Sequence, residues 1–427
     1  MAGASLGARR RPHAAAGCRG QGRARRHVSR AVSAQQRFLL LLILVGALAT
    51  VLGLVSKRAR LLPYPVVLAA AGVVVGLLPG GALGHVGADV ILLAFVPGLV
   101  FEAALTLDLP ELRRRLLPVG LLATAGVALT VVLIGTLTHL ILGLSWASGM
   151  LLGAILAATD PIAVVTLMRR MNAPPGLSAI LEGESLFNDG TGVAVFTAVL
   201  ATILSGAPSV GDAALRFLEI TLGGAAIGLA VGFLGLLLLR FAADAPLEIL
   251  ATLVIAYGSY LAADVVHASG IVAVVVAGIV VARYGTAIGR LHGPQLLGFW
   301  SLFAFVLNAV LFILVGAALP AWELLPVFGF VLVVFLIMLV TRAIPVYGIL
   351  GMSAFRPPAI PWAWRHMTFW AGVRGALSVA LALSVANLPG VDSRVALIAY
   401  GVVLLSLLVQ GGLVSPVTKA LGIERVA

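Results

Sequence analysis

The chain of 427 residues has little charge and almost no cysteine. Asp, Glu, Lys and Arg make up 10% of its residues, against about 25% in an ordinary soluble domain. A soluble fold could not bury 61% hydrophobic residues, so the excess apolar surface must face lipid. The composition therefore excludes a soluble globular protein, a disordered chain and a nucleic-acid binder. The single cysteine, Cys18, excludes an intrachain disulfide and a multi-cysteine metal site.

Long apolar runs fill most of the chain, and the mean hydropathy is +1.14. The runs are continuous over nearly twenty residues, which is typical of transmembrane helices and not of barrel strands, where apolar and polar residues alternate. The sequence therefore predicts an all-α polytopic membrane protein with about thirteen transmembrane helices. The predicted spans are residues 38–55, 65–80, 87–107, 117–142, 147–168, 177–204, 214–239, 246–263, 269–283, 294–319, 324–350, 362–387 and 393–417.

The distribution of basic residues predicts the orientation of these spans. Nearly all Lys and Arg residues beyond residue 37 fall in loops after odd-numbered spans, whereas the even-numbered loops hold only Arg216 and Arg394. The positive-inside rule then places the C-terminus in the cytoplasm, with the first span starting outside. This predicts a transmembrane domain at 38–420, followed by a short cytoplasmic C-terminus at 421–427.

Residues 1–37 contradict that orientation, because they carry nine arginines and no acid. Three interpretations stay open: a cleaved signal peptide, an over-extended start with the natural start near Val28 or Val32, and a disordered basic tail. The net charge of +12 comes mostly from this segment, so it indicates no acidic partner for the rest of the chain.

Two predicted spans contain residues that interrupt a helix. In GAILAATDPIAVVTLM, Pro161 follows Asp160, and proline disfavours helical backbone at the residue before it. In MTFWAGVRGALSVALALSV, Gly372 and Gly375 flank Arg374. The two sites are seven spans apart, so spans 1–6 and 8–13 would form two inverted six-helix repeats with interrupted helices 5 and 12. Paired interrupted helices indicate the binding site of a transporter.

Acidic residues inside a bilayer cost several kcal/mol and mark functional sites. Five acids lie inside predicted spans: Glu102, Asp160, Glu182, Glu184 and Asp189. On a helix, Ser185 and Asp189 are one turn apart, and Glu184 stacks under Asn188. Four oxygen-bearing side chains thus share one patch of one span, and oxygen ligands suit hard cations.

Two further charges, and Glu102 among the five acids, need a partner or a role. Arg374 is predicted as the only basic residue well inside a span, and a buried arginine needs an acid partner, either Glu184 or Glu182. Glu102 is either an acid near the membrane edge or a gate or extra ligand facing the site. Glu248 lies within about a turn of the end of its span and is expected at the membrane interface.

Four segments together resemble the monovalent cation:proton antiporters of the NhaP type, relatives of the animal sodium/proton exchangers. They are PGLVFEAAL at 97–105, AATDPIAVV at 157–165, EGESLFNDGTGVAVF at 182–196 and AGVRGALSVALAL at 371–383. The resemblance covers nearly all of 38–420. It implies a secondary active antiporter, not an enzyme, that exchanges Na⁺, or else Li⁺ or K⁺, for H⁺ by alternating access and without a cofactor.

The resemblance also implies roles for individual residues. Asp189 is implied as the carboxylate that binds cation and proton in turn, and Asn188 before it goes with electroneutral one-for-one exchange. Further cation ligands are implied at Ser185, Glu102 and the Thr159 backbone.

Other features are implied in the same way. Asp160 is expected at the crossing of the two interrupted helices, and Glu184 is expected to pair with Arg374. Members of this family are commonly homodimers in the cell membrane. The sequence shows no long cytoplasmic regulatory tail or nucleotide-binding domain, so regulation by such parts is not expected.

Two other classes of membrane protein stay open from the residues alone. A cation channel would need several rings of polar residues along its spans, whereas the polar atoms here concentrate at one level. A non-transport polytopic protein is the second alternative. Intramembrane hydrolases need catalytic pairs or metal ligands at helical spacing, but His85, His267 and His292 fall in loops or at span edges.

Overall fold

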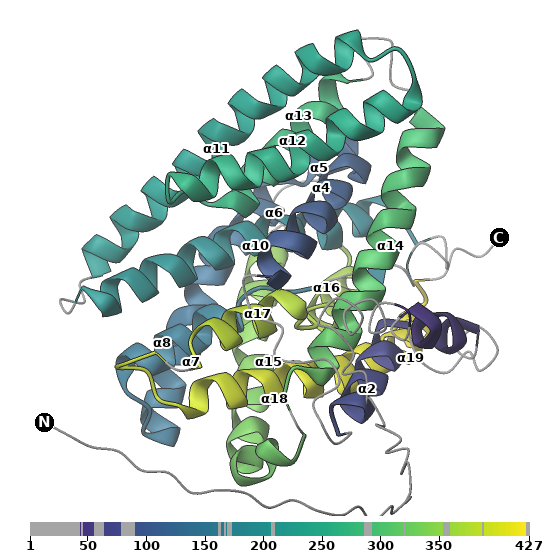
Figure 1. The fold of residues 1–427 in the computed structure, drawn as a ribbon. Coiled ribbons are helices and arrows are strands. Elements are labelled where there is room, and N and C mark those ends of the chain that lie inside the picture. The colour runs from purple at the N-terminus through teal and green to yellow at the C-terminus, as the bar shows by residue number, and fades with distance from the viewer. Residues whose placement is uncertain are drawn as a thin grey trace, which may run out of the picture. The chain divides into compact units, whose positions relative to one another are not determined.

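The computed structural model describes residues 43, 46–54, 64–77, 90–160, 164–165, 168, 173–205, 210–285, 293–319, 321–352, 359–386 and 388–423. All regular structure among these residues is helical, which confirms the predicted all-α class (Figure 1). Cys18, His85, His292 and the basic segment 1–37 lie outside the described residues.

Helices occupy the positions of all thirteen predicted spans, the first being represented by residues 46–54. Within the described part of the chain, seven helical segments are long and apolar enough to cross a membrane, and four shorter ones are also apolar. The number of crossings and the inverted repeat stay predictions. The α-helices are α2 (Tyr64–Gly76), α4 (Val96–Thr106), α5 (Leu109–Arg114), α6 (Leu116–Leu121), α7 (Val127–Leu142), α8 (Trp146–Ile155), α10 (Pro175–Leu204), α11 (Val210–Phe241), α12 (Ala245–Val265), α13 (Gly270–Tyr284), α14 (Gly293–Ala317), α15 (Phe328–Met352), α16 (Trp362–Trp370), α17 (Ala376–Ser384), α18 (Arg394–Ser406) and α19 (Gly412–Ala420).

Two predicted spans are interrupted in the structure. Helix α8 ends at Ile155, and residues 156–160 are not helical. Helix α16 ends at Trp370 and α17 begins at Ala376, so 371–375 form a second non-helical stretch. The second break lies where the glycines predicted it, and the first lies on the N-terminal side of Pro161, itself outside the described residues. Both interruptions leave main-chain groups free to bond elsewhere.

Among the residues that the structure describes, three other spans contain a π-helical turn that the sequence did not predict. These turns are Ile91–Phe95 before α4, Leu122–Gly126 between α6 and α7, and Leu407–Gly411 between α18 and α19. A π-helical turn widens the helix by one residue and occurs often at functional sites. No proline or glycine pattern distinguishes these turns from continuous helix, which explains why periodicity missed them.

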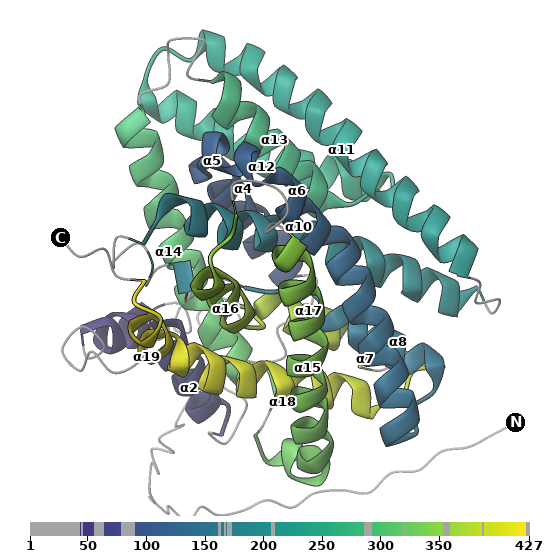
Figure 2. The same ribbon diagram turned by 180° about the vertical axis from the view of Figure 1, so that it is seen from behind.

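Helix α10 lies between two hydrophobic clusters and positions most of the polar residues discussed below. Its Leu177 and Leu181 belong to the cluster that contains α7, α8 and α15, while Ile180 and Leu186 belong to the cluster of α4, α12 and α13. Helices α8, α11 and α13 pack directly against it. Figures 1 and 2 show α10 in the middle of the bundle, with α11, α12 and α13 on one side and α15, α17 and α18 on the other.

Helix α11 carries a long exposed apolar surface. Its leucine and phenylalanine side chains stay exposed along the outer face, whereas small residues face α13. A methyl group at Gly228 would contact the backbone of Ala273, so glycine permits this close packing. A surface of this kind suits contact with lipid. The exposed side chains are Leu215, Leu218, Leu222, Leu229, Phe233, Leu234, Leu237 and Leu238.

Candidate functional site

The two interrupted segments are bonded to each other through their main chains. The Asp160 amide donates to the Val373 carbonyl at 2.7 Å, and Ser378 Oγ donates to the Ile155 carbonyl at 2.7 Å. The side chain of Asp160 lies directly against Gly375, where any Cβ atom would overlap it. The structure thus places Asp160 at the crossing that the resemblance implied.

Arg374 is buried beside the free end of α8, with an exposed fraction of 1%. Its Nη1 donates to the carbonyls of Ala157 and Ala158, each at 3.2 Å. Its backbone amide donates to Ser406 Oγ at 3.0 Å. The guanidinium therefore supplies donors and positive charge to carbonyls that the helix break leaves without partners, at the negative end of the α8 dipole.

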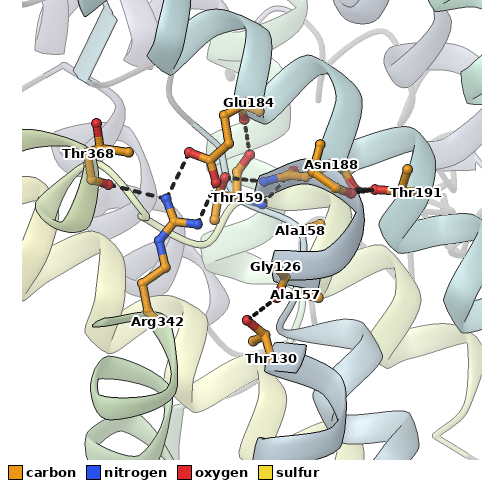
Figure 3. A network of polar contacts seen from close by, with 12 residues as sticks. Gly126, Thr130, Ala157, Ala158, Thr159, Glu184, Asn188, Thr191, Arg342 and Thr368 are labelled. Carbon is orange, nitrogen blue, oxygen red and sulfur yellow. Dashed lines mark hydrogen bonds and ion pairs between the residues drawn. The ribbon is translucent and has the colours of Figure 1, made fainter. Parts of the chain in front are cut away.

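Glu184 pairs with Arg342 in α15 and not with Arg374, so the predicted Glu184–Arg374 ion pair is wrong. Arg342 Nη1 and Nη2 contact the two Glu184 carboxylate oxygens at 2.5 and 2.9 Å (Figure 3). Arg342 Nη2 also donates to the Thr368 carbonyl at 3.2 Å, which ties α16 to the pair. Both side chains are buried, so each charge compensates the other where little solvent can reach them.

Arg342 lies near the end of the predicted span 324–350, so the loop distribution of basic residues groups it with the loop arginines. Ten helical residues follow it in α15, so Arg374 is not the only basic residue inside a span. Ten residues of helix extend over about 15 Å, so Arg342 lies well inside the helix and not at its end. Either Arg342 or Arg374 could supply the cation that the buried Glu184 carboxylate needs. Spacing along the sequence does not show which of two residues on other helices lies closer to it.

Asn188 and Ser185 of α10 hold the broken segment at Thr159. The Thr159 amide donates to Asn188 Oδ1 at 3.2 Å, and Asn188 Nδ2 donates to Thr159 Oγ1 at 2.7 Å (Figure 3). Ser185 Oγ donates to the Thr159 carbonyl. All three residues are buried, so the amide of Asn188 replaces helical partners that Thr159 lost at the break.

A cavity of about 580 Å³ lies at this crossing. Glu182, Ser185 and Asp189 line it from α10, and their spacing of three and four residues puts them on one face of that helix. Glu102 of α4 and Asp160 line it as well. Glu184 is absent from this lining, so α10 directs one polar face to the cavity and another side to Arg342.

Three polar residues near the site were not assigned by sequence reasoning. Asn308 and Ser301 of α14 line the cavity seven residues apart, and Asn308 Oδ1 is buried without a hydrogen bond among the described residues. Thr191 of α10 donates to the Ala123 carbonyl of a π-helical turn at 2.5 Å. Glu248 lies in the first turn of α12 and is fully buried within the protein, and its expected position at the membrane interface stays a prediction.

An all-helical membrane protein with carboxylates in a cavity at the crossing of two interrupted helices has the architecture of a secondary transporter. Residues 43–420 match the family described as sodium/hydrogen exchanger, transmembrane. The chain belongs to this family and is a multi-pass membrane protein, which confirms the resemblance.

Relatives include the Na(+)/H(+) antiporter ApNhaP of Aphanothece halophytica, 35% identical over 91% of this chain and 75% of the relative. The Na(+)/H(+) antiporter NhaG of Bacillus atrophaeus is 32% identical over the same shares of the two chains. Among solved structures, the sodium proton antiporter MjNhaP1 from Methanocaldococcus jannaschii has a TM-score of 0.73 and 20% identity. That match covers 90% of this chain and 100% of MjNhaP1, and at this identity it shows the fold.

Proposed function

We propose that the chain is a secondary active antiporter that exchanges Na⁺ for H⁺. Membership of the sodium/hydrogen exchanger family and relatives named as Na(+)/H(+) antiporters support this proposal. Both ions are substrates, and the proposed cycle uses no cofactor. Residues 38–420 form the proposed antiporter domain, with 1–37 and 421–427 as short flanking segments.

The observation that carries the proposal is the position of Asp189. Its carboxylate lines the cavity with Asp160, Ser185 and Glu102, at the crossing of the two interrupted segments. Carboxylate, hydroxyl and carbonyl oxygens are ligands for hard cations. In the proposed site Asp189 and Asp160 carry the charge, and Ser185, Glu102 and the Thr159 carbonyl complete the coordination.

Competition at one carboxylate would couple the two ion fluxes. Asp189 holds either a cation or a proton, and each of them neutralises its charge. The empty, charged carboxylate is costly in the membrane interior, so it should not cross between the two faces. Exchange then follows without a second carrier, and moving the site between faces by rocking or an elevator-like shift gives alternating access.

Asn188 supports an electroneutral, one-for-one stoichiometry. Its amide is neutral and holds no exchangeable proton, and both ends of the amide bond to Thr159. Asp189 is then the carboxylate whose proton is exchanged for the cation. In this role Asn188 fixes the broken segment and keeps a second charge out of the exchange site.

The proposed location is the cell membrane, with the C-terminus in the cytoplasm, and the proposed assembly is a homodimer. The cytoplasmic position of the C-terminus rests on the distribution of Lys and Arg among the loops. The dimer rests on the family resemblance. Chemical cross-linking of the purified protein in lipid would test the dimer, and accessibility of a C-terminal tag in oriented vesicles would test the orientation.

Replacement of Asp189 tests the proposed exchange directly. Asp189→Asn keeps the shape of the side chain but cannot exchange a proton, so Na⁺-dependent proton movement in proteoliposomes should be lost. Glu323→Gln, at an exposed position, is the matched control and should keep wild-type exchange. Substantial exchange in folded Asp189→Asn would refute the proposal. A panel of Na⁺, Li⁺ and K⁺ with a pH-sensitive dye identifies the substrate cation.

Saturation separates the proposed antiporter from a channel. A carrier should show saturable exchange and trans-stimulation by cation on the opposite side, because each turnover moves one loaded site. A channel would conduct without counterflow. Currents that grow linearly with voltage in a planar bilayer would favour the channel.

A further inference from the structure

Arg115 is a buried arginine for which the described residues provide no ion pair, whereas Arg342 pairs with Glu184 and Arg374 donates to main-chain carbonyls. Arg115 lies between α5 and α6, and only 9% of the residue is exposed. Its guanidinium stacks over the ring of Trp364 in α16, 5.0 Å from the ring centre. Its Nε is buried and has no hydrogen-bond partner among the described residues. An aromatic ring stabilises a cation but accepts no hydrogen bond from Nε, so the donor stays unsatisfied.

The acid nearest to this guanidinium already has another partner. Glu111 interacts electrostatically with Arg115, but its Oε1 accepts a hydrogen bond from Arg114 Nη1 at 2.9 Å. The positive charge of Arg114 repels that of Arg115. On the other side, Arg365 follows Trp364 in α16 and directs its Nε to the Ile360 carbonyl at 3.0 Å. The local charge is therefore positive.

The start of α10 faces the same guanidinium. A methyl group at Gly176, the second residue of α10, would lie 3.1 Å from Arg115 Nε. This helix of 30 residues has no side-chain cap at Pro174 and no acid in its first turn. The positive end of its dipole thus lies in direct contact with a buried cation, an arrangement that is unfavourable unless an anion bound beside the guanidinium compensates both.

We propose that Arg115 and the first turn of α10 form a binding site for a phosphate oxyanion, with Trp364 holding the plane of the guanidinium. Arginine binds phosphate oxygens through two parallel hydrogen bonds, and helix N-termini bind the same group. The ligand is either the headgroup of an anionic phospholipid or a free phosphate. Occupation of the site would join α10, which carries Asp189, to α16.

The predicted topology places the site at headgroup level. Helices α6, α10 and α16 each begin after a loop predicted to be cytoplasmic, and all three starts meet at Arg115. Tryptophan is enriched at the membrane–water interface, where the ring of Trp364 would lie. The inference does not depend on which cation is transported, and its test reads stability and binding instead of transport.

Thermal unfolding in lipids of different charge tests the site. The full chain is placed in nanodiscs of phosphatidylcholine, with or without phosphatidylglycerol, and in detergent with either inorganic phosphate or chloride at equal ionic strength. We expect phosphatidylglycerol to raise the wild-type Tm by several degrees, because a ligand that binds only the folded state stabilises it. Arg115→Gln should lose this increment, while Arg113→Gln, at an exposed position of the same helix, should keep it.

The two ligand sources give different results in this experiment. An increment with phosphatidylglycerol alone identifies a lipid headgroup, whereas an equal increment with inorganic phosphate identifies a free anion. An Arg115→Gln variant with a lower Tm but an unchanged lipid increment would reduce Arg115 to a packing partner of Trp364 and overturn the proposal. No increment in the wild type under any condition would also overturn it.

Arg115→Lys keeps the proposal testable if Arg115→Gln does not fold. Lysine retains the charge but loses the paired hydrogen bonds. Affinity for short-chain phosphatidic acid in detergent should then fall about tenfold, the effect of losing one charge-assisted hydrogen bond. Equal affinity of wild type and Arg115→Lys would show that the geometry of the guanidinium is not used and would contradict the proposed site.

Discussion

The backbone amide of Asp160 donates to the carbonyl of Val373 at 2.7 Å, so the two interrupted spans are joined through their main chains. Arg374, the next residue after Val373, donates back to the Ala157 and Ala158 carbonyls. Residues at each helix break therefore provide hydrogen-bond partners for main-chain groups at the other break. The hydrocarbon interior of a bilayer provides no such partners. If one interrupted helix moves, either the other moves with it or the hydrogen bonds between them break.

Gly375→Ala should disrupt this crossing. A Cβ atom at this position would overlap the side chain of Asp160, while the backbone angles of Gly375 are open to alanine, so the effect is steric. We expect a loss of at least tenfold in the initial rate of Na⁺-dependent proton movement, measured with a pH-sensitive dye in proteoliposomes. Gly348→Ala in α15, where no atom lies within 4 Å of the new Cβ, is the control. Full activity in Gly375→Ala would show that Asp160 can shift without consequence.

Breaking the Glu184–Arg342 pair should destabilise the fold. Arg342→Met leaves the Glu184 carboxylate buried without its counter-ion, at a cost of about 3–5 kcal/mol. The double variant Arg342→Met/Glu184→Gln should recover much of this loss, because no uncompensated charge remains. A double-mutant cycle on unfolding free energies in mixed detergent measures the coupling. A larger coupling in the Glu184/Arg374 cycle would restore the pair predicted from the sequence.

Asn188→Asp should change the stoichiometry and preserve most of the local structure. A carboxylate can still accept the Thr159 amide, and the Thr159 hydroxyl can donate to it in place of accepting. The second carboxylate provides a second site for a proton. We therefore expect exchange in the variant to respond to an imposed membrane potential, whereas the wild type does not. A wild type that responds to potential would contradict electroneutral exchange.

Thr191→Val should weaken the contact between α10 and the π-helical turn at Leu122–Gly126. The hydroxyl of Thr191 donates to the Ala123 carbonyl at 2.5 Å, and valine fills the same volume without this donor. We expect a loss of about 1 kcal/mol in the unfolding free energy, the net contribution of one hydrogen bond. Thr191→Ser keeps the hydroxyl and should retain most of the stability. Equal losses in both variants would indicate that the methyl group matters instead.

The Asp392–Arg394 pair should add a small acid-dependent contribution to stability. Hydrogen bonds from the Arg394 side chain hold the pKa of Asp392 below its usual value, since they favour the charged carboxylate. A lowered pKa stabilises the fold above the unfolded-state pKa of about 4, and the contribution disappears as the pH falls through the folded-state pKa. The Tm difference between wild type and Asp392→Asn should hold from pH 7 to about 5 and shrink below about pH 4. The pair is partly exposed, so its contribution should stay below about 1 kcal/mol.

Much of the fold follows from local features of the sequence. Apolar runs of the right length located the helices, because a bilayer requires about twenty apolar residues per crossing. The glycines around Arg374 located one break, and Pro161 located the other to within a few residues. The acids that line the cavity were found because a charge inside the bilayer needs a functional reason.

The partners of these residues could not be found in the same way. Arg374 had two candidate acid partners by composition, Glu184 and Glu182, and Arg342 lies near the end of an apolar run, where it resembles a loop residue. Asn308 offered no signal beyond a polar residue in a span. The π-helical turns have no marker in composition or period. Each of these features depends on which helix faces which, and spacing along one helix does not contain that information.

The sequence by itself determined the class of protein, the positions of its helices, both interruptions and the acids of the cavity, because hydrophobicity and backbone preference act over a few neighbouring residues. Only the tertiary structure decided that Glu184 pairs with Arg342 and that Arg374 serves the carbonyls of Ala157 and Ala158. Hydrogen bonds and ion pairs between distant segments depend on distances of a few ångströms, and these are set by the packing of the whole bundle.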